Sequence, residues 1–351
     1  MGLNALLVFV PFAVGLDLVH ADPLWVFLTS ALAIVPLAGL LGKATEHLTT
    51  HVGTGVGGLL NASLGNAAEL IIAFVALKEG LHDVVKASLT GSIIGNVLLV
   101  LGASMVAGGL RYHQQRFNRT MAGVGSSLLL LAAVGLVIPA ISDVTATEQG
   151  TAVDHALSLG IAVILFTIYL LNLVFTLKTH KHLFLGEAVD AEEAGEQPWS
   201  LRKSVGVLAV VTAAVAVMSE ILVGAIEPAA LRLGMSKLFV GVILVALVGN
   251  AAEHSTAVLV ASKNKMDLAL GIAIGSSLQI ALFVAPVLVF ASYAIGKPLD
   301  LIFTPFEVAA VTISVLATGF VSMDGESNWL EGALLIGVYL MLAIAFYFLP
   351  A

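Results

Sequence analysis

Two glutamates stand in otherwise apolar stretches of the chain, and each comes three residues after an asparagine. Asn66 and Glu69 lie in SLGNAAELIIAFVALKEG, and Asn250 and Glu253 lie in GNAAEH. A charged side chain at the centre of a bilayer costs about 2.5–3.5 kcal/mol on insertion scales. A carboxyl retained at that cost predicts a role in binding a cation or a proton. The alternative is a protonated glutamate that only hydrogen-bonds a neighbouring helix.

The polar residues around these glutamates are oxygen donors. Glycine tolerates unusual backbone angles and asparagine often does, so each Gly-Asn pair predicts a helix break that frees backbone carbonyls. The segments that follow supply the further candidate ligands Ser92, Asn96, Ser276 and Gln279. Such a set suits Ca²⁺, which takes 6–8 oxygens. Zn²⁺ and Cu⁺ favour imidazole or thiolate, and the chain has no cysteine.

Four further side chains are weighed for proton transfer. His254 follows Glu253 directly, but successive helical residues point about 100° apart, so we expect it to face another surface, with a proton-relay role left open. Glu220, within VAVMSEILVGAI, ranks highest as a proton-path candidate. Glu46 lies near a helix end, where a solvated position is an equal alternative. Glu307, in TPFEVAA, is explained by a favourable place at a helix N-terminus.

The elements that position these residues are membrane helices. Of 351 residues, 59% are hydrophobic and 11% are charged, against roughly 25% charged in a soluble domain. The N-terminus has no positively charged n-region and is read as a helix rather than a signal peptide. The pattern predicts an all-α integral membrane protein with about eleven spans, at residues 5–19, 24–48, 54–79, 83–109, 118–139, 152–178, 200–229, 236–262, 267–295, 304–321 and 329–349.

The chain repeats itself after 184 residues. The match holds register across a helix-loop-helix, which a chance match of five letters would not do. Each unit would hold five helices, and because five is odd the second unit would enter the membrane from the opposite side, as in many secondary transporters. The aligned pairs are Gly65–Glu69 with Gly249–Glu253, Asp83 with Asp267, and Gly91–Ser92 with Gly275–Ser276.

The repeat divides the chain into an extra N-terminal helix (1–22), a first unit (23–180), an acidic linker (181–199) and a second unit (200–351). Basic residues collect on one side, which the positive-inside rule places in the cytoplasm together with the N-terminus. The C-terminus would then lie outside a cell (inner) membrane. Ten basic residues fall on the cytoplasmic side and five on the other: Lys43, Arg111, Arg116, Arg119, Lys178, Lys181, Arg202, Lys203, Lys263 and Lys265 against Lys78, Lys86, Arg232, Lys237 and Lys297.

Inverted symmetry brings equivalent positions together, so we expect Glu69 and Glu253 to face each other near the midplane. Two like charges in a low-dielectric site repel, and such a pair holds protons unless a cation replaces them. The sequence therefore predicts exchange of a cation for protons. A channel is a weaker alternative, because a titrating pair suits coupled exchange. An intramembrane phosphotransferase is a weaker alternative still, since it needs basic residues at membrane depth and almost all Lys and Arg lie in loops.

GNAAELI followed by GSIIGN, and GNAAEH followed by GSSLQIALFVAP, resemble the paired motifs of the cation/proton exchanger family, within the calcium/cation antiporter superfamily. The resemblance covers essentially the whole chain. It implies Ca²⁺ export from the cytoplasm driven by H⁺, and Na⁺ is the alternative driving ion. Glu69 and Glu253 would bind the ion and the protons, surrounded by the matching residues Asn66, Asn250, Ser92, Ser276 and Gln279. Asn96 aligns with Ile280, so its contact with the ion stays open.

The linker between the halves is acidic and holds no basic residue in LGEAVDAEEAGEQPWS. It is either a solvated connection or a low-affinity Ca²⁺ sensor on the cytoplasmic face, and the family resemblance favours the sensor. The acids concerned are Glu187, Asp190, Glu192, Glu193 and Glu196.

We expect no cofactor, with Ca²⁺ as transported substrate. The expected partners are Ca²⁺, H⁺ and lipid, and a net charge of −8 excludes nucleic acid. A homo-oligomer is left open.

Overall fold

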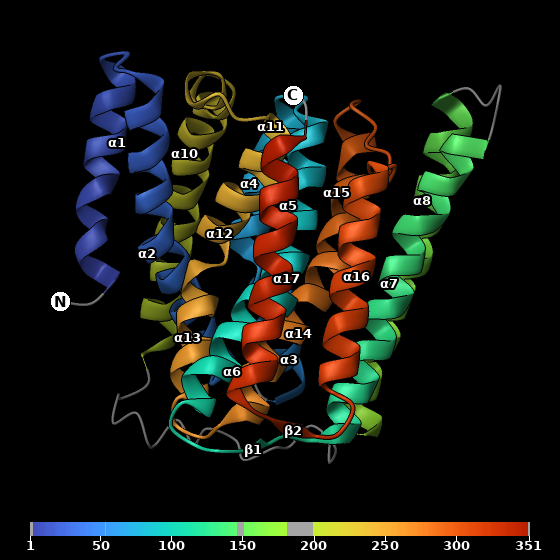
Figure 1. Ribbon diagram of the computed structural model, residues 1–351. Coiled ribbons are helices and arrows are strands. Elements are labelled where there is room, and N and C mark those ends of the chain that lie inside the picture. Colours follow the sequence, from blue (N-terminus) through green and yellow to red (C-terminus); the bar gives the residue numbers. More distant parts are fainter. Residues whose placement is uncertain (1–2, 53, 146–150, 181–198, 350–351) are drawn as a thin grey trace.

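The computed structural model describes residues 3–52, 54–145, 151–180 and 199–349, and these residues are almost entirely helical (Figure 1). Two strands of two residues each, β1 (Gln115–Arg116) and β2 (Glu326–Ser327), pair antiparallel at one end of the bundle. The first half comprises η1 (Leu3–Val8), α1 (Phe9–Leu18), α2 (Pro23–Thr49), α3 (Thr54–Leu64), α4 (Ala67–Lys78), α5 (His82–Ile94), η2 (Gly95–Val100), α6 (Leu101–Gly109), α7 (Arg119–Thr145), α8 (Thr151–Val174) and η3 (Phe175–Thr179).

The second half of the chain continues the same pattern of long helices joined by short turns. It comprises α10 (Leu201–Leu233), α11 (Lys237–Phe239), η5 (Val240–Val245), α12 (Ala246–Gly249), α13 (Ala251–Ala261), α14 (Met266–Gln279), η6 (Ile280–Val284), α15 (Ala285–Ala294), α16 (Pro305–Val321) and α17 (Trp329–Phe348). The segments η2, η3, η5 and η6 are π-helical turns within longer helices. π-Turns of this kind occur frequently at functional sites.

The helices fall where the sequence predicts membrane spans. Within the described residues, seven helices are long and apolar enough to cross a bilayer, or eight if the bent pair 237–249 and 251–261 counts as one span. The remaining predicted spans correspond to two shorter apolar helices, at 4–18 and 305–321, and to the interrupted pair α3–α4. The prediction of an all-α, multi-span membrane protein is confirmed.

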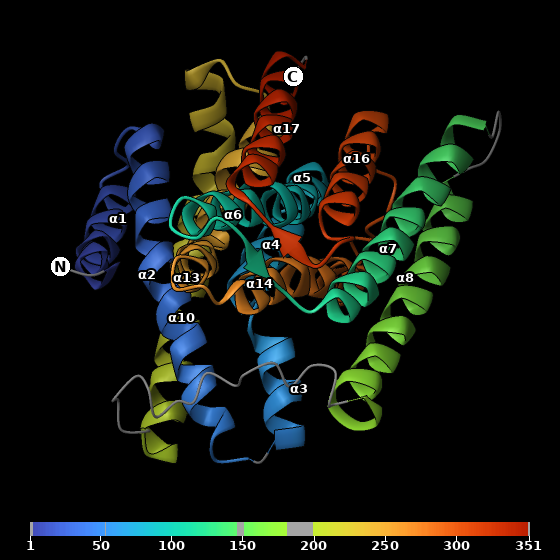
Figure 2. The same cartoon turned by 60° about the horizontal axis from the view of Figure 1, so that its bottom comes forward.

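Burial separates an inner group of helices from an outer one. The apolar window of 82–109 is 83% buried within the protein and that of 266–294 is 72% buried, whereas the windows of α8 and α10 are each 33% buried. In Figure 2 α5, α6 and α14 lie in the middle of the bundle, with α1 and α8 at its edges. The inner group therefore surrounds any site that must be shielded from lipid.

The bounds of the inner helices repeat with the spacing found in the sequence. A shift of 184 residues places α4, α5, η2 and α6 on α13, α14, η6 and α15, to within one residue at every end. The chain rises from α3 to α4 in Figure 1 and descends from α12 to α13. It likewise descends from α5 to α6 and rises from α14 to α15.

Glycines let the backbones of two inner segments come into direct contact. A Cβ built on Gly91 of α5 would lie 1.9 Å from the backbone oxygen of Val242 in η5. On the other side of the same contact, a Cβ on Gly241 would lie 2.6 Å from the Cβ of Ala87. Small residues at such crossings are typical of helix packing in membranes, where close van der Waals contact replaces the hydrophobic driving force.

Candidate functional site: two facing carboxylates at helix breaks

Both Gly-Asn pairs interrupt a helix inside the bundle, as the sequence predicts. Asn66 (φ −99°, ψ 31°) separates α3 from α4, and Asn250 (φ −92°, ψ 3°) separates α12 from α13. The second break bends the chain by 61°. Each glutamate is the third residue of the helix that follows, where the N-terminal end of the helix dipole favours negative charge. The break thus places a carboxyl beside backbone N–H groups within the protein.

Each carboxylate lies against the glycine of the opposite motif. A Cβ on Gly249 would lie 3.3 Å from Cγ and 3.5 Å from Oε1 of Glu69. A Cβ on Gly65 would lie 4.0 Å from Oε1 of Glu253. The two carboxylates are close enough to act on each other electrostatically. Glu69 is buried, and Oε2 of Glu253 is a buried oxygen that accepts no hydrogen bond from the described residues.

A continuous set of hydrogen bonds joins the predicted neighbours of the two glutamates, and we call these residues the polar cluster. Its members are Asn66, Ser92, Asn96, Asn250, Ser276 and Gln279, and they come from both halves. Asn66 Nδ2 donates to Gln279 Oε1 (2.6 Å), and Ser276 Oγ donates to Asn66 Oδ1 (2.8 Å). Asn250 Nδ2 donates to Ser92 Oγ (3.0 Å). Six residues spread over the chain thus meet at one place.

Asn96 occupies the middle of this cluster. Its Nδ2 donates to Ser276 Oγ (3.0 Å) and to Asn250 Oδ1 (3.4 Å). Its Oδ1 lies 3.0 Å from Nε2 of His254. His254 therefore contacts the polar cluster, which the sequence alone did not indicate. The 100° offset from Glu253 holds, but Asn96 lies in the π-turn η2 of a crossing helix and meets the imidazole on that side.

The two acids expected to serve a proton path do not reach the cluster. The side chain of Glu220 is 61% exposed and pairs with Lys78, at 3.6 Å between Oε1 and Nζ. The position of Glu220 therefore does not support the proton-path role expected for it, because this face of α10 looks outward. Glu46 is exposed near the end of α2, in accord with the solvated alternative. The acids of the linker lie outside the described residues.

Most of the side-chain groups that could ligate a cation at this site are neutral oxygens. In the part of the chain that the structure describes, no three acidic or histidine side chains converge to hold a metal ion. The charge of the site therefore comes from Glu69 and Glu253, and amide and hydroxyl oxygens surround them. Two carboxylates balance one divalent cation or, equally, two protons. Membrane-length helices closed around such a pair define a cation transporter.

The family model described as sodium/calcium exchanger protein matches the chain twice, at residues 23–178 and 203–348. The chain therefore belongs to this family, and the two matches fall on the two units separated in the sequence. The resemblance to the cation/proton exchanger branch is confirmed by the relatives that follow. All of them are named as transporters, so the chain is a transporter and not an enzyme.

The chain is 48% identical to the Ca²⁺/H⁺ antiporter of Aphanothece halophytica, over 98% of this chain and 96% of the relative. It is 46% identical to the Ca²⁺/H⁺ antiporter ChaA of Bacillus subtilis (strain 168), over 97% of each. The solved structure of native YfkE superposes with a TM-score of 0.86 at 42% identity, covering 99% of this chain and 100% of that one. The H⁺/Ca²⁺ exchanger CAX shares the fold, with a TM-score of 0.71 at 15% identity.

Proposed function

We propose that this protein exports Ca²⁺ from the cytoplasm in exchange for H⁺, with Glu69 and Glu253 as one shared site for both ions. The observation that carries the proposal is the crossed packing of each carboxylate against the glycine of the other motif. This packing directs both charges at one locus, with neutral oxygens around them. The names of the relatives at 46–48% identity support Ca²⁺ and H⁺ as the ions.

The chemistry of exchange follows from charge balance at that locus. Ca²⁺ is neutralised by two carboxylates, and the empty pair is neutralised by two protons. The site is therefore electrically neutral whenever its exposure changes from one side of the membrane to the other. The conformational change never has to bury two uncompensated carboxylates, whose desolvation in a low dielectric costs much free energy. Oε2 of Glu253, which accepts no hydrogen bond within the described part of the chain, supports this role, because such an oxygen is open to a proton or a cation.

Neutral oxygens of the polar cluster complete the Ca²⁺ shell in this proposal. Asn66, Asn250, Ser92, Ser276 and Gln279 each place a side-chain oxygen in the cluster. Asn96 and His254 act as positioning residues, because Asn96 bridges the two halves and the imidazole fixes its amide. Ca²⁺ accepts such flexible, mixed oxygen shells more readily than Mg²⁺, which demands near-ideal octahedral geometry.

Alternating access would arise from two inverted units that rock against each other. The repeated helix bounds and the opposite chain directions of α3–α4 and α12–α13 support this arrangement. With the N-terminus in the cytoplasm, protons entering from outside displace Ca²⁺ there. Inside, Ca²⁺ displaces the protons again.

Transport in proteoliposomes tests the proposal and its main alternative. Purified protein is reconstituted, and uptake of radioactive Ca²⁺ is followed under an imposed H⁺ gradient or an imposed Na⁺ gradient. We expect uptake with the H⁺ gradient and none with Na⁺ alone. Uptake driven by Na⁺ and indifferent to H⁺ would show a Na⁺-driven exchanger instead.

A further inference from the structure

The π-turn η2 deprives one backbone oxygen of its usual helical donor, directly beside Asn96 of the polar cluster. In a regular α-helix the N–H of Leu101 would donate to the oxygen of Val97, four residues earlier. In η2 this N–H donates to the oxygens of Asn96 and Leu98 instead, and so passes over Val97. Val97 is buried, and a buried carbonyl that loses its donor costs free energy unless another donor replaces it.

The hydroxyl of Thr318, on α16, supplies the replacement. Thr318 is fully buried, and its Oγ1 donates to Val97 O at 3.0 Å. Two other hydroxyls of α16, those of Thr312 and Ser314, each donate to the carbonyl four residues earlier on α16 itself. That is a common arrangement for threonine and serine inside a helix. Thr318 differs from these neighbours because its bond joins α16 to another helix.

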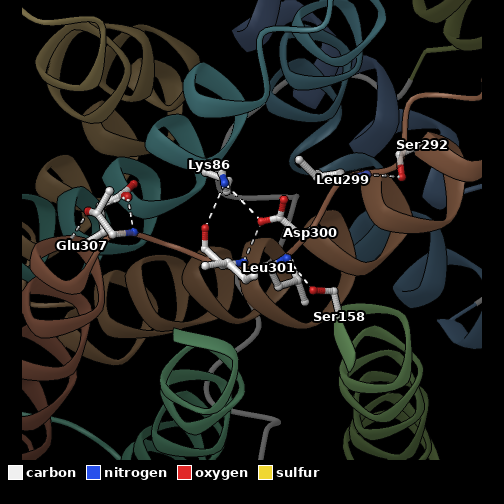
Figure 3. A network of polar contacts seen from close by, with 9 residues as sticks. Lys86, Ser158, Ser292, Leu299, Asp300, Leu301 and Glu307 are labelled. Atoms are coloured by element: carbon white, nitrogen blue, oxygen red, sulfur yellow. Dashed lines mark hydrogen bonds and ion pairs between the residues drawn. The ribbon is translucent and has the colours of Figure 1, made fainter. Parts of the chain in front are cut away.

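A second contact fixes α16 along the long helix 82–109, at the N-terminal end of α16. Glu307 Oε2 accepts hydrogen bonds from Thr304 N (3.0 Å) and Thr304 Oγ1 (2.9 Å), and this capping box confirms the predicted place at a helix N-terminus. Glu307 Oε1 accepts a third bond from Thr90 Oγ1 on α5 (3.1 Å). Figure 3 shows this end of α16, where Lys86 of α5 also pairs with Asp300 in the preceding segment (3.2 Å). The contact to η2 lies about three turns further along α16.

Asn96 is the side chain that η2 presents to the polar cluster. It donates to Ser276 Oγ and Asn250 Oδ1, and its own oxygen lies 3.0 Å from His254 Nε2. Successive helical residues point about 100° apart, and a π-turn holds about one residue more than an α-turn. Loss of the π-turn would therefore rotate Asn96 by about 100° against the helix on one side of it. The contacts of Asn96 with both halves depend on the π-turn.

The equivalent π-turn of the second half carries no polar cluster residue and faces no hydroxyl at the equivalent place. In η6 the N–H of Ala285 donates to Ile280 O, five residues earlier. Ile280 stands where the first half has Asn96. The residue 184 positions before Thr318 is Val134, which has no hydroxyl and is 43% exposed. The threonine is thus present opposite the π-turn that serves the cluster, and its counterpart at the other π-turn is a valine.

We propose that Thr318 is a positioning residue of the Ca²⁺ site, which acts through η2 on Asn96. Its hydroxyl stabilises the π-turn against the α-helical alternative, in which the N–H of Leu101 would satisfy Val97 O. The π-turn in turn places the Asn96 amide between the two halves of the polar cluster. The inference deepens the proposed Ca²⁺/H⁺ exchange and rests on it.

The kinetics of H⁺-driven Ca²⁺ uptake in proteoliposomes test this role. Thr318→Val keeps the shape of the side chain but removes the hydroxyl. We expect the Ca²⁺ concentration for half-maximal uptake to rise about tenfold, which corresponds to about 1.4 kcal/mol and lies within the range for a buried group that loses its partner. The maximal rate should change little, because saturating Ca²⁺ draws Asn96 back into place. Thr318→Ser restores the hydroxyl and should restore the half-maximal concentration.

Ser314→Ala is the matched control. Ser314 is fully buried one turn earlier on the same helix, but its hydroxyl donates within α16. We expect this variant to take up Ca²⁺ with the wild-type half-maximal concentration. An unchanged value in Thr318→Val, an equal rise in Ser314→Ala, or no recovery in Thr318→Ser would each overturn the proposal. Thr318→Ala, measured in parallel, removes the hydroxyl without adding a methyl, so the test does not depend on the folding of one variant.

A double-mutant cycle shows whether Thr318 acts through Asn96. Asn96→Ala should itself raise the half-maximal Ca²⁺ concentration, and adding Thr318→Val should raise it no further, because the group that the π-turn positions is already gone. Effects that multiply in full would contradict this route. A wild-type protein that takes up no Ca²⁺ under an H⁺ gradient would overturn the proposed function itself. Wild-type exchange with unaffected Thr318 variants would overturn only the positioning role.

Discussion

Glu69 and Glu253 each occupy the third position of a helix that begins inside the bundle, and this placement makes them sensitive to loss of charge. Glutamine at either position keeps size and hydrogen bonding but cannot ionise. Each pair of unit charges at 4 Å is worth about 4 kcal/mol at an effective dielectric of 20, so one lost carboxylate weakens Ca²⁺ binding severely. We expect Glu69→Gln and Glu253→Gln each to abolish Ca²⁺/H⁺ exchange in proteoliposomes while the protein remains monodisperse.

The exposed Glu46 provides the comparison for these variants. Glu46→Gln removes the same charge from the same half of the chain, far from the polar cluster along α2, and should transport at the wild-type rate. Near-normal exchange in both Glu69→Gln and Glu253→Gln would rule out the paired-carboxylate mechanism.

Ca²⁺ and protons compete for the same carboxylate oxygens, and this competition gives a second prediction for Glu69 and Glu253. Ca²⁺ binding should release protons and should weaken as the pH falls, because the protonated pair must lose its protons before it can ligate the ion. Calorimetry in buffers with different ionisation enthalpies measures the released protons directly. Ca²⁺ binding with the same heat in every buffer would mean that the two ions do not share a site.

Most of the cluster could be predicted from the sequence, because the motif repeats and its polar residues lie one turn from one another. The orientation of His254 could not, since it depends on Asn96, which approaches from a crossing helix in a π-turn. Glu220 was misjudged because an apolar neighbourhood looks the same on the inner and outer faces of a membrane helix. The bond from Thr90 to Glu307 joins residues 217 positions apart, and no local pattern predicts it.

Among the elements, the contact between α5 and η5 leaves no room for a further side-chain carbon. A Cβ on Gly91 would meet the backbone of Val242, which cannot rotate away as a side chain could. We expect Gly91→Ala to destabilise the protein by about 3 kcal/mol or more, at the upper end of overpacking effects. The measurement is the thermal unfolding temperature in detergent.

Gly95, one turn further along the same helix, is the matched position. A Cβ there would meet nothing within 4 Å, so Gly95→Ala should unfold at or above the wild-type temperature. Equal losses at Gly91 and Gly95 would show that the effect does not come from the α5–η5 contact.

The helix breaks and the π-turns differ in how well the sequence predicts them. Gly-Asn pairs indicate a break through their backbone preferences, and both breaks fall where expected. The π-turns η2 and η6 occupy GNVLLV and IALFV, and the Gly-Asn pair at the start of η2 opens a π-turn and does not break the helix. Neither sequence pattern predicts a π-turn, so only the structure reveals that the two recur at equivalent places.

At the scale of the whole molecule, the side of the membrane on which each end lies is open to direct test. The chain has no cysteine, so single introduced cysteines report cleanly. We expect Ala191→Cys and Met323→Cys to react with an impermeant thiol reagent from the cytoplasm, and Ala351→Cys to react only from outside. Met323 is exposed in the turn beside β2. Labelling of Ala191→Cys and Ala351→Cys from one side would remove the odd number of spans and the inverted repeat with it.

The crossed contacts between Glu69 and Gly249, and between Glu253 and Gly65, also limit which residues the two motifs can carry. Each half supplies a carboxylate and also the wall against which the other half's carboxylate rests. A larger residue at Gly249 would contact the side chain of Glu69, which lies 180 positions away in the sequence. A change in the glycine of one motif therefore acts on the carboxylate of the other, and the sequences of the two halves constrain each other.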